Sequence, residues 1–427
     1  MAKITFIGTG YVGLVSGTCM VEIGHDVICV DKDVSKIKLL ANGEIPIYEP
    51  ELDKVVKSNI ANGRLTFTSN LSEAVIASDY IFIAVGTPQS ETGQADLSQV
   101  FSCIEEIKKD LSGAKYIITK STVPVGTGKK IEKLIANDEI SVCSNPEFLR
   151  EGNALKDFMQ PDRIIIGSNS ENAADKVGEL YSPLVSKTNA PIILTSLETA
   201  ELIKYSSNAF LATKVAFINE IADLCEASGA DVTQVSLGMG LDERIGSKFL
   251  NPGPGIGGSC FPKDTKALVA IGKEYGAEQN IVKTVVKSND DRKTNCGKKV
   301  KRYLNGDLNN KKIAVLGVTF KANTDDLRAS PALEIINYLL SEGAIINLHD
   351  PQGLKNAKKL FGNRISYNQD LESNLIDVDA AVIVTEWNEY KDIDFEGFKT
   401  PILIDFRNLY TPTDFINKNI KYYPIGR

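Results

Sequence analysis

Histidine is scarce in this chain of 427 residues, which holds only His25 and His349. Each lies beside a strand-like segment, so chemistry based on a histidine general base is not expected. The seven cysteines are odd in number and form neither Cys-x-x-Cys pairs nor Cys/His clusters. That pattern argues against a disulfide framework and against a structural zinc site, and it favours a reducing cytosol. We therefore expect a cytoplasmic protein without a metal.

Long apolar runs are also missing, because none reaches the roughly 18 residues that indicate a membrane span. The first strand-like segment begins at Lys3 and leaves no room for a signal peptide. A net charge of −7 argues against general nucleic-acid binding, which needs a basic face, although a few local cations could still hold a small anionic ligand. The composition, 43% hydrophobic and 24% charged, is that of a globular protein with two or three domains.

The opening segment carries the motif GTGYVG at residues 8–13 between a strand-like stretch (4–7) and a helix-compatible one. A second strand (26–30) ends at Asp31, 18 residues after Gly13. This strand–turn–helix–strand order is that of a dinucleotide-binding unit. Gly8 permits the tight turn, Gly10 lets the backbone approach a pyrophosphate, and Gly13 allows close helix–strand packing. A carboxylate at Asp31 accepts from a ribose 2′-OH and repels a 2′-phosphate, which predicts NAD and not NADP.

Further strand signals at 65–68, 80–88, 115–123 and 163–168 alternate with helical segments and predict a mostly parallel, doubly wound sheet. A similar pattern restarts at 312–320, 346–351, 380–387 and 401–407. The segment from Arg64 aligns without gaps to the segment from Arg364, which predicts two related α/β units. The second unit has GVTFKA in place of the glycine motif, so we expect it to bind something other than a dinucleotide. Chance similarity of two βαβ units is the alternative.

One long helix of about 30 residues is predicted over 196–229, where apolar residues recur at spacings of three and four without an internal proline or glycine. A helix of that length bridges two domains or packs against a copy of itself. We predict an α/β protein with two Rossmann-like doubly wound domains joined by a long central helix. The expected boundaries are 1–195 for the NAD-binding domain, 196–305 for a central helical dimerisation region, and 306–427 for a C-terminal domain.

Cys260 differs from the other cysteines because it stands in GIGGSCFPKD, residues 255–264. Gly257 and Gly258 are expected to leave its approach sterically open, and Lys263 supplies a nearby cation that favours a thiolate. Cys19, Cys29, Cys103, Cys143 and Cys225 lie in apolar stretches and read as small core residues, whereas Cys296 lies in a charged stretch. A turn cysteine without a role is the alternative for Cys260.

The long helix places Lys204 and Asn208 on one face, four residues apart. A lysine in a partly desolvated cleft can act as an acid, a base or an oxyanion clamp, and the amide can donate a hydrogen bond. A solvated surface pair is the plain alternative. Together, NAD and a reactive thiol fit the oxidation of an aldehyde through a thiohemiacetal, with a thioester that water hydrolyses to an acid.

Over essentially its whole length, the sequence resembles the UDP-glucose/GDP-mannose dehydrogenase family, in particular its UDP-glucose 6-dehydrogenases. The motifs that carry the resemblance stand in order at 8–13, 121–127, 145–152, 201–220, 255–264, 320–328 and 384–390. The resemblance implies NAD-dependent, four-electron oxidation of the C6 alcohol of UDP-glucose to UDP-glucuronate, with two NADH formed. It implies an enzyme of nucleotide-sugar metabolism that supplies polysaccharide biosynthesis.

The resemblance also implies residue roles. Cys260 becomes the nucleophile, Lys204 and Asn208 stabilise the oxyanion, Asp264 positions water and Lys204, and Glu147 and Thr122 handle water during hydrolysis. How the general-base role divides among Lys204, Asp264 and Glu147 is left open. Implied NAD contacts are Gly8, Gly10, Tyr11, Val12, Gly13, Asp31, Lys36, Thr87, Thr122, Glu151, Lys263 and Arg328. Implied UDP-sugar contacts are Phe148, Leu149, Arg150, Glu151, Gly152, Lys204, Asn208, Arg244, Phe249, Leu250, Asn251, Pro252, Gly253, Gly257, Lys321 and Arg407. Arg244 would reach the neighbouring subunit's site, which implies a homodimer.

Three alternatives remain. A dehydrogenase of UDP-N-acetylhexosamines would share fold and chemistry, but Ser259 precedes the nucleophile where those relatives usually carry histidine. A single-step β-hydroxyacid dehydrogenase shares the Lys-x-x-x-Asn helix and needs neither the thiol nor the second nucleotide-like domain. A non-catalytic NAD sensor or scaffold would have no use for Cys260, Lys204 and Asp264 together.

Overall fold

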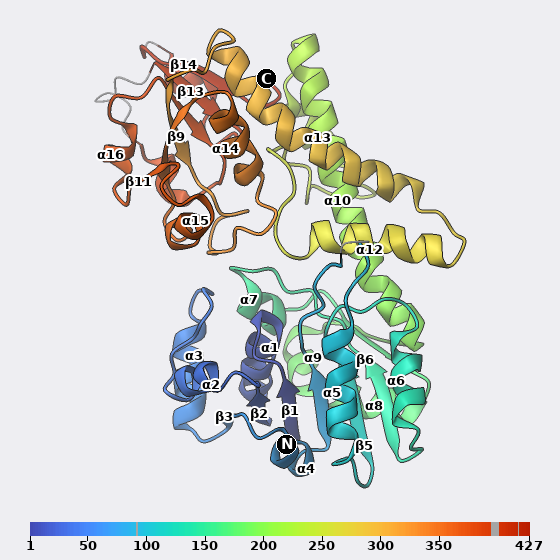
Figure 1. The fold of residues 1–427 in the computed structure, drawn as a ribbon. Coiled ribbons are helices and arrows are strands. Elements are labelled where there is room, and N and C mark those ends of the chain that lie inside the picture. The colour runs from blue at the N-terminus through green and yellow to red at the C-terminus, as the bar shows by residue number, and fades with distance from the viewer. Residues whose placement is uncertain (91–92, 394–400, 417) are drawn as a thin grey trace. The chain divides into compact units, whose positions relative to one another are not determined.

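The computed structural model describes residues 1–90, 93–393, 401–416 and 418–427 (Figure 1). The chain divides into two compact units, one formed by residues 1–207 with 270–277 and the other by 208–269 with 278–427. Two helices contribute to both units, α10 (Leu197–Ser228) and α12 (Phe261–Glu274). Helix α10 has 32 residues and confirms the long helix predicted from the sequence. No helix among the described residues is long and apolar enough to cross a membrane.

The first unit contains an eight-stranded sheet of order β3-β2-β1-β4-β5-β6-β7-β8. All neighbouring strands run parallel except β6 and β7, which confirms the mostly parallel sheet. The strands are β1 (Lys3–Ile7), β2 (Asp26–Val30), β3 (Leu65–Thr68), β4 (Tyr80–Ile83), β5 (Lys115–Thr119), β6 (Ile140–Ser144), β7 (Ile164–Ser168) and β8 (Ile192–Thr195).

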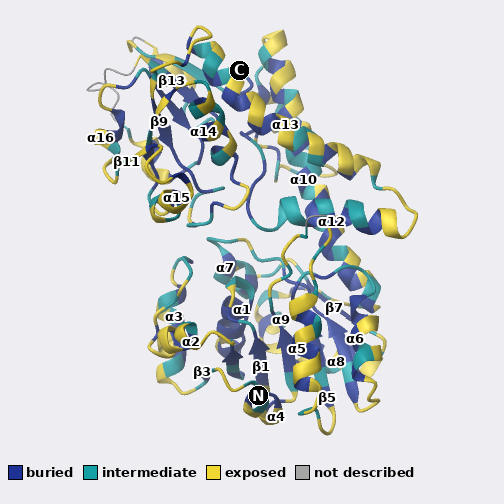
Figure 2. Cartoon of the chain, in the orientation of Figure 1, coloured by how far each residue is buried: buried dark blue, intermediate teal, exposed yellow. Residues whose placement is uncertain are grey.

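Helices cover both faces of this sheet and bury its central strands, as is typical of parallel strands (Figure 2). One face packs against α1 (Tyr11–Glu22), α3 (Leu52–Ala61), α7 (Ala154–Met159), α8 (Glu171–Glu179) and α9 (Ser182–Thr188). The other face packs against α4 (Leu71–Ala77), α5 (Ser98–Lys108) and α6 (Thr127–Ile135). Helix α2 (Val34–Ala41) follows β2, with Asp33 as its N-cap.

The second unit contains a six-stranded parallel sheet of order β11-β10-β9-β12-β13-β14. Its strands are β9 (Lys312–Leu316), β10 (Ile345–His349), β11 (Ser366–Tyr367), β12 (Ala380–Ile383), β13 (Ile402–Asp405) and β14 (Lys421–Pro424). Its helices are α11 (Val232–Gly240), α13 (Asn280–Tyr303), α14 (Pro331–Ser341), α15 (Leu354–Phe361) and α16 (Leu371–Leu375), with 3-10 turns at Asn388–Lys391 and Pro412–Phe415. The strand order repeats that of β3 to β6 in the first unit, so the predicted internal repeat is confirmed.

Sequence patterns did not identify four of the described strands, β6, β8, β11 and β14. Each has five residues or fewer, and apolar runs that short do not separate strand from helix without their partners.

Candidate active site

The glycines of the first turn differ in their surroundings, and those of Gly8 and Gly13 agree with the tight turn and the close packing that the sequence predicted. Gly8 has a φ of 100°, and a Cβ there would lie 2.7 Å from the carbonyl oxygen of Ala84. A Cβ on Gly13 would lie 1.9 Å from the carbonyl oxygen of Gly8, so helix α1 could not approach the turn. At Gly10 a Cβ would meet nothing within 4 Å. The turn therefore leaves open space at Gly10, next to the N-terminus of α1, where a pyrophosphate fits.

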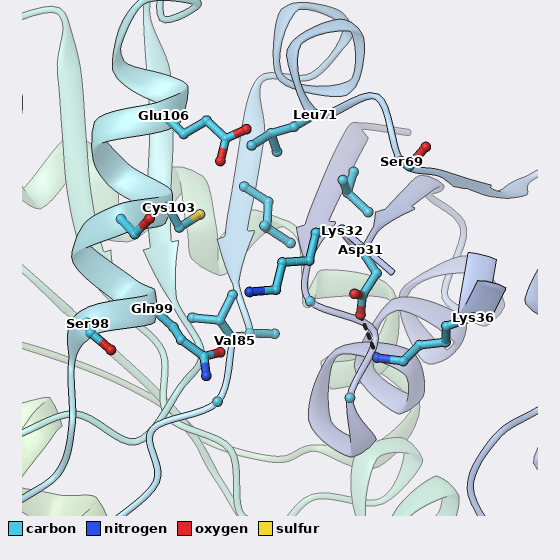
Figure 3. A pocket seen from close by; sticks show the side chains of 17 residues that line it. Asp31, Lys32, Lys36, Ser69, Leu71, Val85, Ser98, Gln99, Cys103 and Glu106 are labelled. Carbon is cyan, nitrogen blue, oxygen red and sulfur yellow. Dashed lines mark hydrogen bonds and ion pairs between the residues drawn. The ribbon is translucent and has the colours of Figure 1, made fainter. Parts of the chain in front are cut away.

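Asp31 follows β2 and borders a cavity of about 560 Å³ above this turn (Figure 3). Its Oδ2 accepts hydrogen bonds from the Thr9 backbone N–H (3.0 Å), the Thr9 hydroxyl (2.7 Å) and Lys36 Nζ (2.8 Å). Burial acts to raise the pKa of Asp31, but these hydrogen bonds together lower it to about 2. The carboxylate is thus charged at neutral pH and suits a ribose hydroxyl.

The opposite wall of the cavity comes from α5, which sequence patterns did not connect with this site. Figure 3 shows Ser98, Gln99, Cys103 and Glu106 on this helix, facing the strand ends. Burial raises the pKa of Cys103 to about 12, so this cysteine remains a thiol.

The loops after β4 and β5 are joined by one predicted pair of cofactor residues. The Thr87 hydroxyl donates to the Thr122 carbonyl oxygen (3.0 Å). Val12, in the first turn of α1, is half-buried.

The loop at 145–152 is anchored by Glu49, which the sequence analysis missed. The carboxylate of Glu49 is 4% exposed and accepts hydrogen bonds from the backbone N–H groups of Gly152 (2.6 Å) and Ala154 (2.7 Å). The Tyr11 hydroxyl donates to the same carboxylate. Burial, together with Glu49, raises the pKa of Tyr11 far above its ordinary value. Tyr11 and Gly152, predicted cofactor and substrate contacts, thus meet at Glu49.

Lys204 and Glu147 form a buried ion pair in the first unit. Lys204 Nζ lies 3.0 Å from Glu147 Oε1 and donates to the Glu147 carbonyl oxygen at 2.7 Å, and both side chains are about 5% exposed or less. The Leu149 N–H donates to the other carboxylate oxygen at 2.5 Å. Two predicted catalytic residues, 57 positions apart in the sequence, are therefore in direct contact.

A second buried lysine, Lys120, lies near this pair and was not predicted. Its Nζ donates to Asn145 Oδ1 (3.0 Å), which also accepts from the Tyr181 hydroxyl (2.5 Å). Burial lowers the pKa of Lys120 to about 8, Lys204 acts in the same direction, and Glu147 opposes them.

Phe148 is bordered by two cations. The Arg163 guanidinium lies 3.6 Å and Lys204 Nζ 5.3 Å from the centre of the Phe148 ring. In contrast, Arg150 is exposed and pairs with Asp157 (2.6 Å), and Glu151 is half-buried on the same loop.

In the second unit, Cys260 immediately precedes α12, and its carbonyl oxygen accepts the first helical hydrogen bond, from Asp264 (2.8 Å). A thiolate there lies at the positive end of the helix dipole. Asp264 is 1% exposed and binds Asn208 Nδ2 (2.6 Å) and Lys263 Nζ (2.5 Å). The structure thus brings Asn208, Lys263 and Asp264 together beside the cysteine.

Cys260 is the only one of the seven cysteines that is not buried. The five cysteines predicted as core residues are buried, and so is Cys296, which packs in the core of the second unit.

The glycines before Cys260 do not leave open space, and that prediction is wrong. A Cβ on Gly257 would lie 2.8 Å from the Ala329 carbonyl oxygen. A Cβ on Gly258, whose φ is 86°, would lie 2.8 Å from the Phe320 ring. Glycine is needed there for close packing of the loop.

Part of the predicted UDP-sugar set also meets in the second unit. The guanidinium of Arg407, after β13, lies beside Gly253, and Arg407 Nε donates to the Val384 carbonyl oxygen (2.7 Å). Phe249 has a φ of 65°, which is unusual for a bulky residue, and its ring packs on Phe261. The remaining residues of this segment range from the buried Leu250 and Pro252 to the exposed Asn251.

Three further predicted cations belong to the second unit. Lys321 Nζ lies 5.4 Å from the Phe320 ring, and the exposed Arg328 pairs with Asp326 (2.8 Å). The side chain of Arg244 is 89% exposed and pairs with Asp242 (2.6 Å).

The first turn of the second sheet explains why a dinucleotide is not expected there. Asp350 follows β10 as Asp31 follows β2, but it is 2% exposed. It accepts from the backbone N–H groups of Val318 (2.7 Å) and Thr319 (3.0 Å) and from Trp387 Nε1 (3.2 Å). Asp31 binds the Thr9 N–H in the same way, but Asp350 binds two amides of its turn and is covered by Trp387, whereas Asp31 borders a cavity.

Solved structures resemble the whole chain. A UDP-glucose dehydrogenase from Pyrobaculum islandicum has a TM-score of 0.92 at 36% identity, covering 100% of this chain and 98% of its own. A UDP-D-ManNAc dehydrogenase from Pyrococcus horikoshii has a TM-score of 0.87 at 28% identity, covering 100% and 99%. Both agree with the predicted fold class, which is confirmed.

Sequence relatives extend over the same length. A UDP-glucose 6-dehydrogenase from Rhizobium meliloti (strain 1021) is 50% identical over 436 residues, covering 100% of this chain and 99% of the relative. The UDP-glucose 6-dehydrogenase TuaD from Bacillus subtilis (strain 168) is 47% identical, covering 100% and 94%.

Three family models match in order along the chain. They are the NAD binding domain of the UDP-glucose/GDP-mannose dehydrogenase family at residues 2–185, its central domain at 198–291 and its UDP binding domain at 314–412. The first match confirms NAD as the cofactor, in agreement with the free space at Gly10 and the charged Asp31. The chain belongs to the UDP-glucose/GDP-mannose dehydrogenase family.

Proposed function

We propose that this chain oxidises the C6 alcohol of UDP-glucose to the carboxylate of UDP-glucuronate, in two NAD-dependent steps. The full-length relatives support this function and favour UDP-glucose over a UDP-N-acetylhexosamine. The observation that carries the chemistry is the single partly exposed thiol, Cys260, at the start of α12 beside Asp264.

NAD, when bound, accepts a hydride in each of the two oxidations. Cys260 Sγ bonds to C6 of the aldehyde, holds it as a thiohemiacetal and, after the second oxidation, as a thioester. Water then cleaves the C–S bond, which releases the acid and the free thiol. The reaction consumes one UDP-glucose, two NAD and one water for each UDP-glucuronate.

Other residues have supporting roles in this proposal. Lys204 stabilises negative charge on the oxygen at C6, with Asn208 as a second donor. In this proposal Glu147, which is held by Lys204 and by the Leu149 N–H, accepts a proton from the hydrolytic water. Asp264 fixes Asn208 and Lys263 through its two carboxylate oxygens. Thr122 lies on the loop that follows β5 and contacts this water and NAD.

The UDP moiety is proposed to bind the second unit, where Arg407 and Gly253 meet beside the ends of β12 and β13. The absence of a free amide cradle at Asp350 is consistent with a ligand other than a dinucleotide.

A homodimer is part of the proposal. Helix α10 exposes Phe210 (66%), Phe217 (47%) and Leu224 (61%) at intervals of seven residues. This spacing places the three side chains along one side of the helix, where a second copy could cover them. Arg244, with its exposed side chain, is then free to contribute to the neighbouring site. A cytoplasmic location suits an enzyme whose seven cysteines lie outside disulfides.

The first test is the amount of NADH formed per UDP-glucose consumed to completion in excess NAD. Two NADH per sugar supports the four-electron oxidation, and one NADH contradicts it in favour of simple alcohol oxidation. Turnover of UDP-N-acetylhexosamines without turnover of UDP-glucose would move the specificity to that related branch.

The variant Cys260→Ser tests the nucleophile. We expect UDP-glucuronate formation to fall by at least about 1,000-fold, because an alcohol at this position is a poor nucleophile and a poor leaving group. Cys296→Ser is the control for loss of a thiol elsewhere. Two NADH per sugar at the wild-type rate in Cys260→Ser would contradict the thioester mechanism.

A further inference from the structure

One side chain of α13 forms two hydrogen bonds with the loop that precedes Cys260. Asn289 Oδ1 accepts a hydrogen bond from the Ile256 N–H (2.6 Å), and Asn289 Nδ2 donates to the Ile256 carbonyl oxygen (3.1 Å). Both backbone groups of Ile256 are thus bound by one amide, four residues before the cysteine.

Two neighbouring residues of α13 bind the start of the same loop and the segment that contacts its other end. Arg292 Nε donates to the Gly253 carbonyl oxygen (3.0 Å). Lys293 Nζ donates to the Ala329 carbonyl oxygen (3.0 Å), and the adjacent Arg328 carbonyl oxygen accepts from the Gly258 N–H (2.8 Å). The spacing of 289, 292 and 293 places all three side chains on one face of the helix.

The loop packs tightly against α13 at Gly255. Gly255 has a φ of 125°, and a Cβ there would lie 3.2 Å from Asn289 Oδ1 and 3.1 Å from Lys293 Cγ. A displacement at Gly255 or at Asn289 is therefore transmitted through the loop toward Cys260.

We propose that Asn289, assisted by Lys293, is a positioning residue for the nucleophile: it fixes residues 255–258 so that Cys260 Sγ is held in line with the substrate carbon. This role rests on the proposed function, because it assigns a purpose to the placement of the thiol. Neither residue touches the reacting atoms.

The activity test compares Asn289→Ala and Asn289→Asp with the wild type. Asn289→Asp keeps the acceptor for the Ile256 N–H but replaces the donor with an oxygen that faces the Ile256 carbonyl oxygen. Because Asn289 is half-buried and aspartate has nearly the same shape as asparagine, we expect this variant to fold. We expect kcat for UDP-glucose to fall about 10- to 100-fold in both, since a displacement of about 1 Å costs up to about 100-fold. The KM for NAD should stay within about twofold, because most of the implied NAD contacts, among them the glycine turn and Asp31, belong to the other unit.

A chemical test does not depend on turnover. Iodoacetamide alkylation of Cys260, followed by mass spectrometry, reports how the loop holds the only cysteine that is not buried. We expect Asn289→Ala to raise the alkylation rate at least about threefold, since loosening the loop exposes more of the thiol. Asn295→Ala is the matched control: Asn295 is exposed on the same helix, and its change should affect neither readout.

The outcomes separate the two proposals. Wild-type kcat and a wild-type alkylation rate in both Asn289 variants would overturn the positioning role even if the enzyme oxidises UDP-glucose. A wild-type chain that leaves UDP-glucose unchanged would overturn the function, while the alkylation rates would still report whether Asn289 holds the loop. A lower melting temperature with unchanged kcat would assign Asn289 a structural role only and would also overturn the inference.

Discussion

At the scale of single residues, Asp31 shows how a local network prepares a binding group. Its Oδ2 already accepts three hydrogen bonds, whereas Oδ1 accepts one from the Asp33 N–H (3.1 Å). Oδ1 therefore retains capacity for a ribose hydroxyl, and Lys36 is neutralised by the carboxylate.

The first prediction concerns cofactor choice. Asp31→Asn removes the charge that repels a 2′-phosphate and frees Lys36 to pair with it. We expect kcat/KM for NADP relative to NAD to rise about 10- to 100-fold, the equivalent of one charge-assisted hydrogen bond. Steady-state kinetics with both cofactors measure the ratio. Asp33→Asn, two residues away on the exposed helix cap, should leave it unchanged, and an unchanged ratio in Asp31→Asn would rule out the specificity role.

The buried pair of Lys204 and Glu147 leads to a second prediction. Lys204→Met leaves the Glu147 carboxylate buried without its ion pair, so we expect a loss of about 3–5 kcal/mol in the free energy of unfolding. The double variant Lys204→Met/Glu147→Gln should recover at least half of that loss because it buries no isolated charge. Chemical denaturation of the two single variants and the double variant gives the coupling. Additive losses would show that the two side chains do not interact in solution.

At the scale of elements, a carboxylate from α10 binds the backbone N–H groups at the N-terminus of α6. Glu201 is 2% exposed and accepts from the backbone N–H groups of Gly126 (2.6 Å) and Gly128 (2.7 Å). Burial raises the pKa of Glu201 from 4.5 to about 7, although these hydrogen bonds act in the opposite direction. The loop with Thr122 is thereby attached to the helix that carries Lys204.

The third prediction is a pH dependence at this contact. Because the pKa is higher in the folded state, folding favours the protonated form. Glu201 thus contributes most stability below about pH 4.5 and loses that contribution as the pH rises to about 7. We expect the melting temperature of the wild type to fall relative to Glu201→Gln over this range. Thermal unfolding of both proteins from pH 4.5 to 8 tests it, with Glu220→Gln as the control at an exposed glutamate of α10. A constant difference would show that Glu201 keeps an ordinary pKa.

At the scale of the whole molecule, the exposed side of α10 determines the assembly that we expect. The fourth prediction is that Phe217→Glu, which places a charge in the middle of the row formed by Phe210, Phe217 and Leu224, converts the dimer to a monomer and reduces activity at least about tenfold. Light scattering after gel filtration measures the mass. Ile76→Glu adds the same charge at an exposed apolar residue of the first unit and should leave the dimer intact. A monomeric wild type, or a dimeric Phe217→Glu, would contradict the proposed interface.

The repeat of two sheets also belongs to this scale. The six strands of the second sheet repeat the order from β3 to β6 in the first, yet Asp31 borders a cavity while Asp350 is buried under Trp387. One fold thus provides a cofactor site at one end of the chain and a different surface at the other.

The sequence by itself determined the features that depend on neighbours along the chain. The glycine turn, Asp31, the repeated strand pattern and the uninterrupted α10 follow from local conformational preference and from periodicity, and NAD follows from them. Cys260 also stood out locally, since none of the other cysteines has such neighbours.

Only the tertiary structure decided which distant groups complete the site. Four of these groups stand in ordinary local sequence: Glu49, Glu201, Lys120 and Asn289. Folding brings the side chains of Glu49, Glu201 and Asn289 against backbone groups 33 or more residues away. It brings Lys120 against Asn145, 25 residues away. The purpose of Gly257 and Gly258 was misread for the same reason. A side chain at either glycine would clash with Ala329 or Phe320. A local sequence pattern does not show which distant residues pack against it.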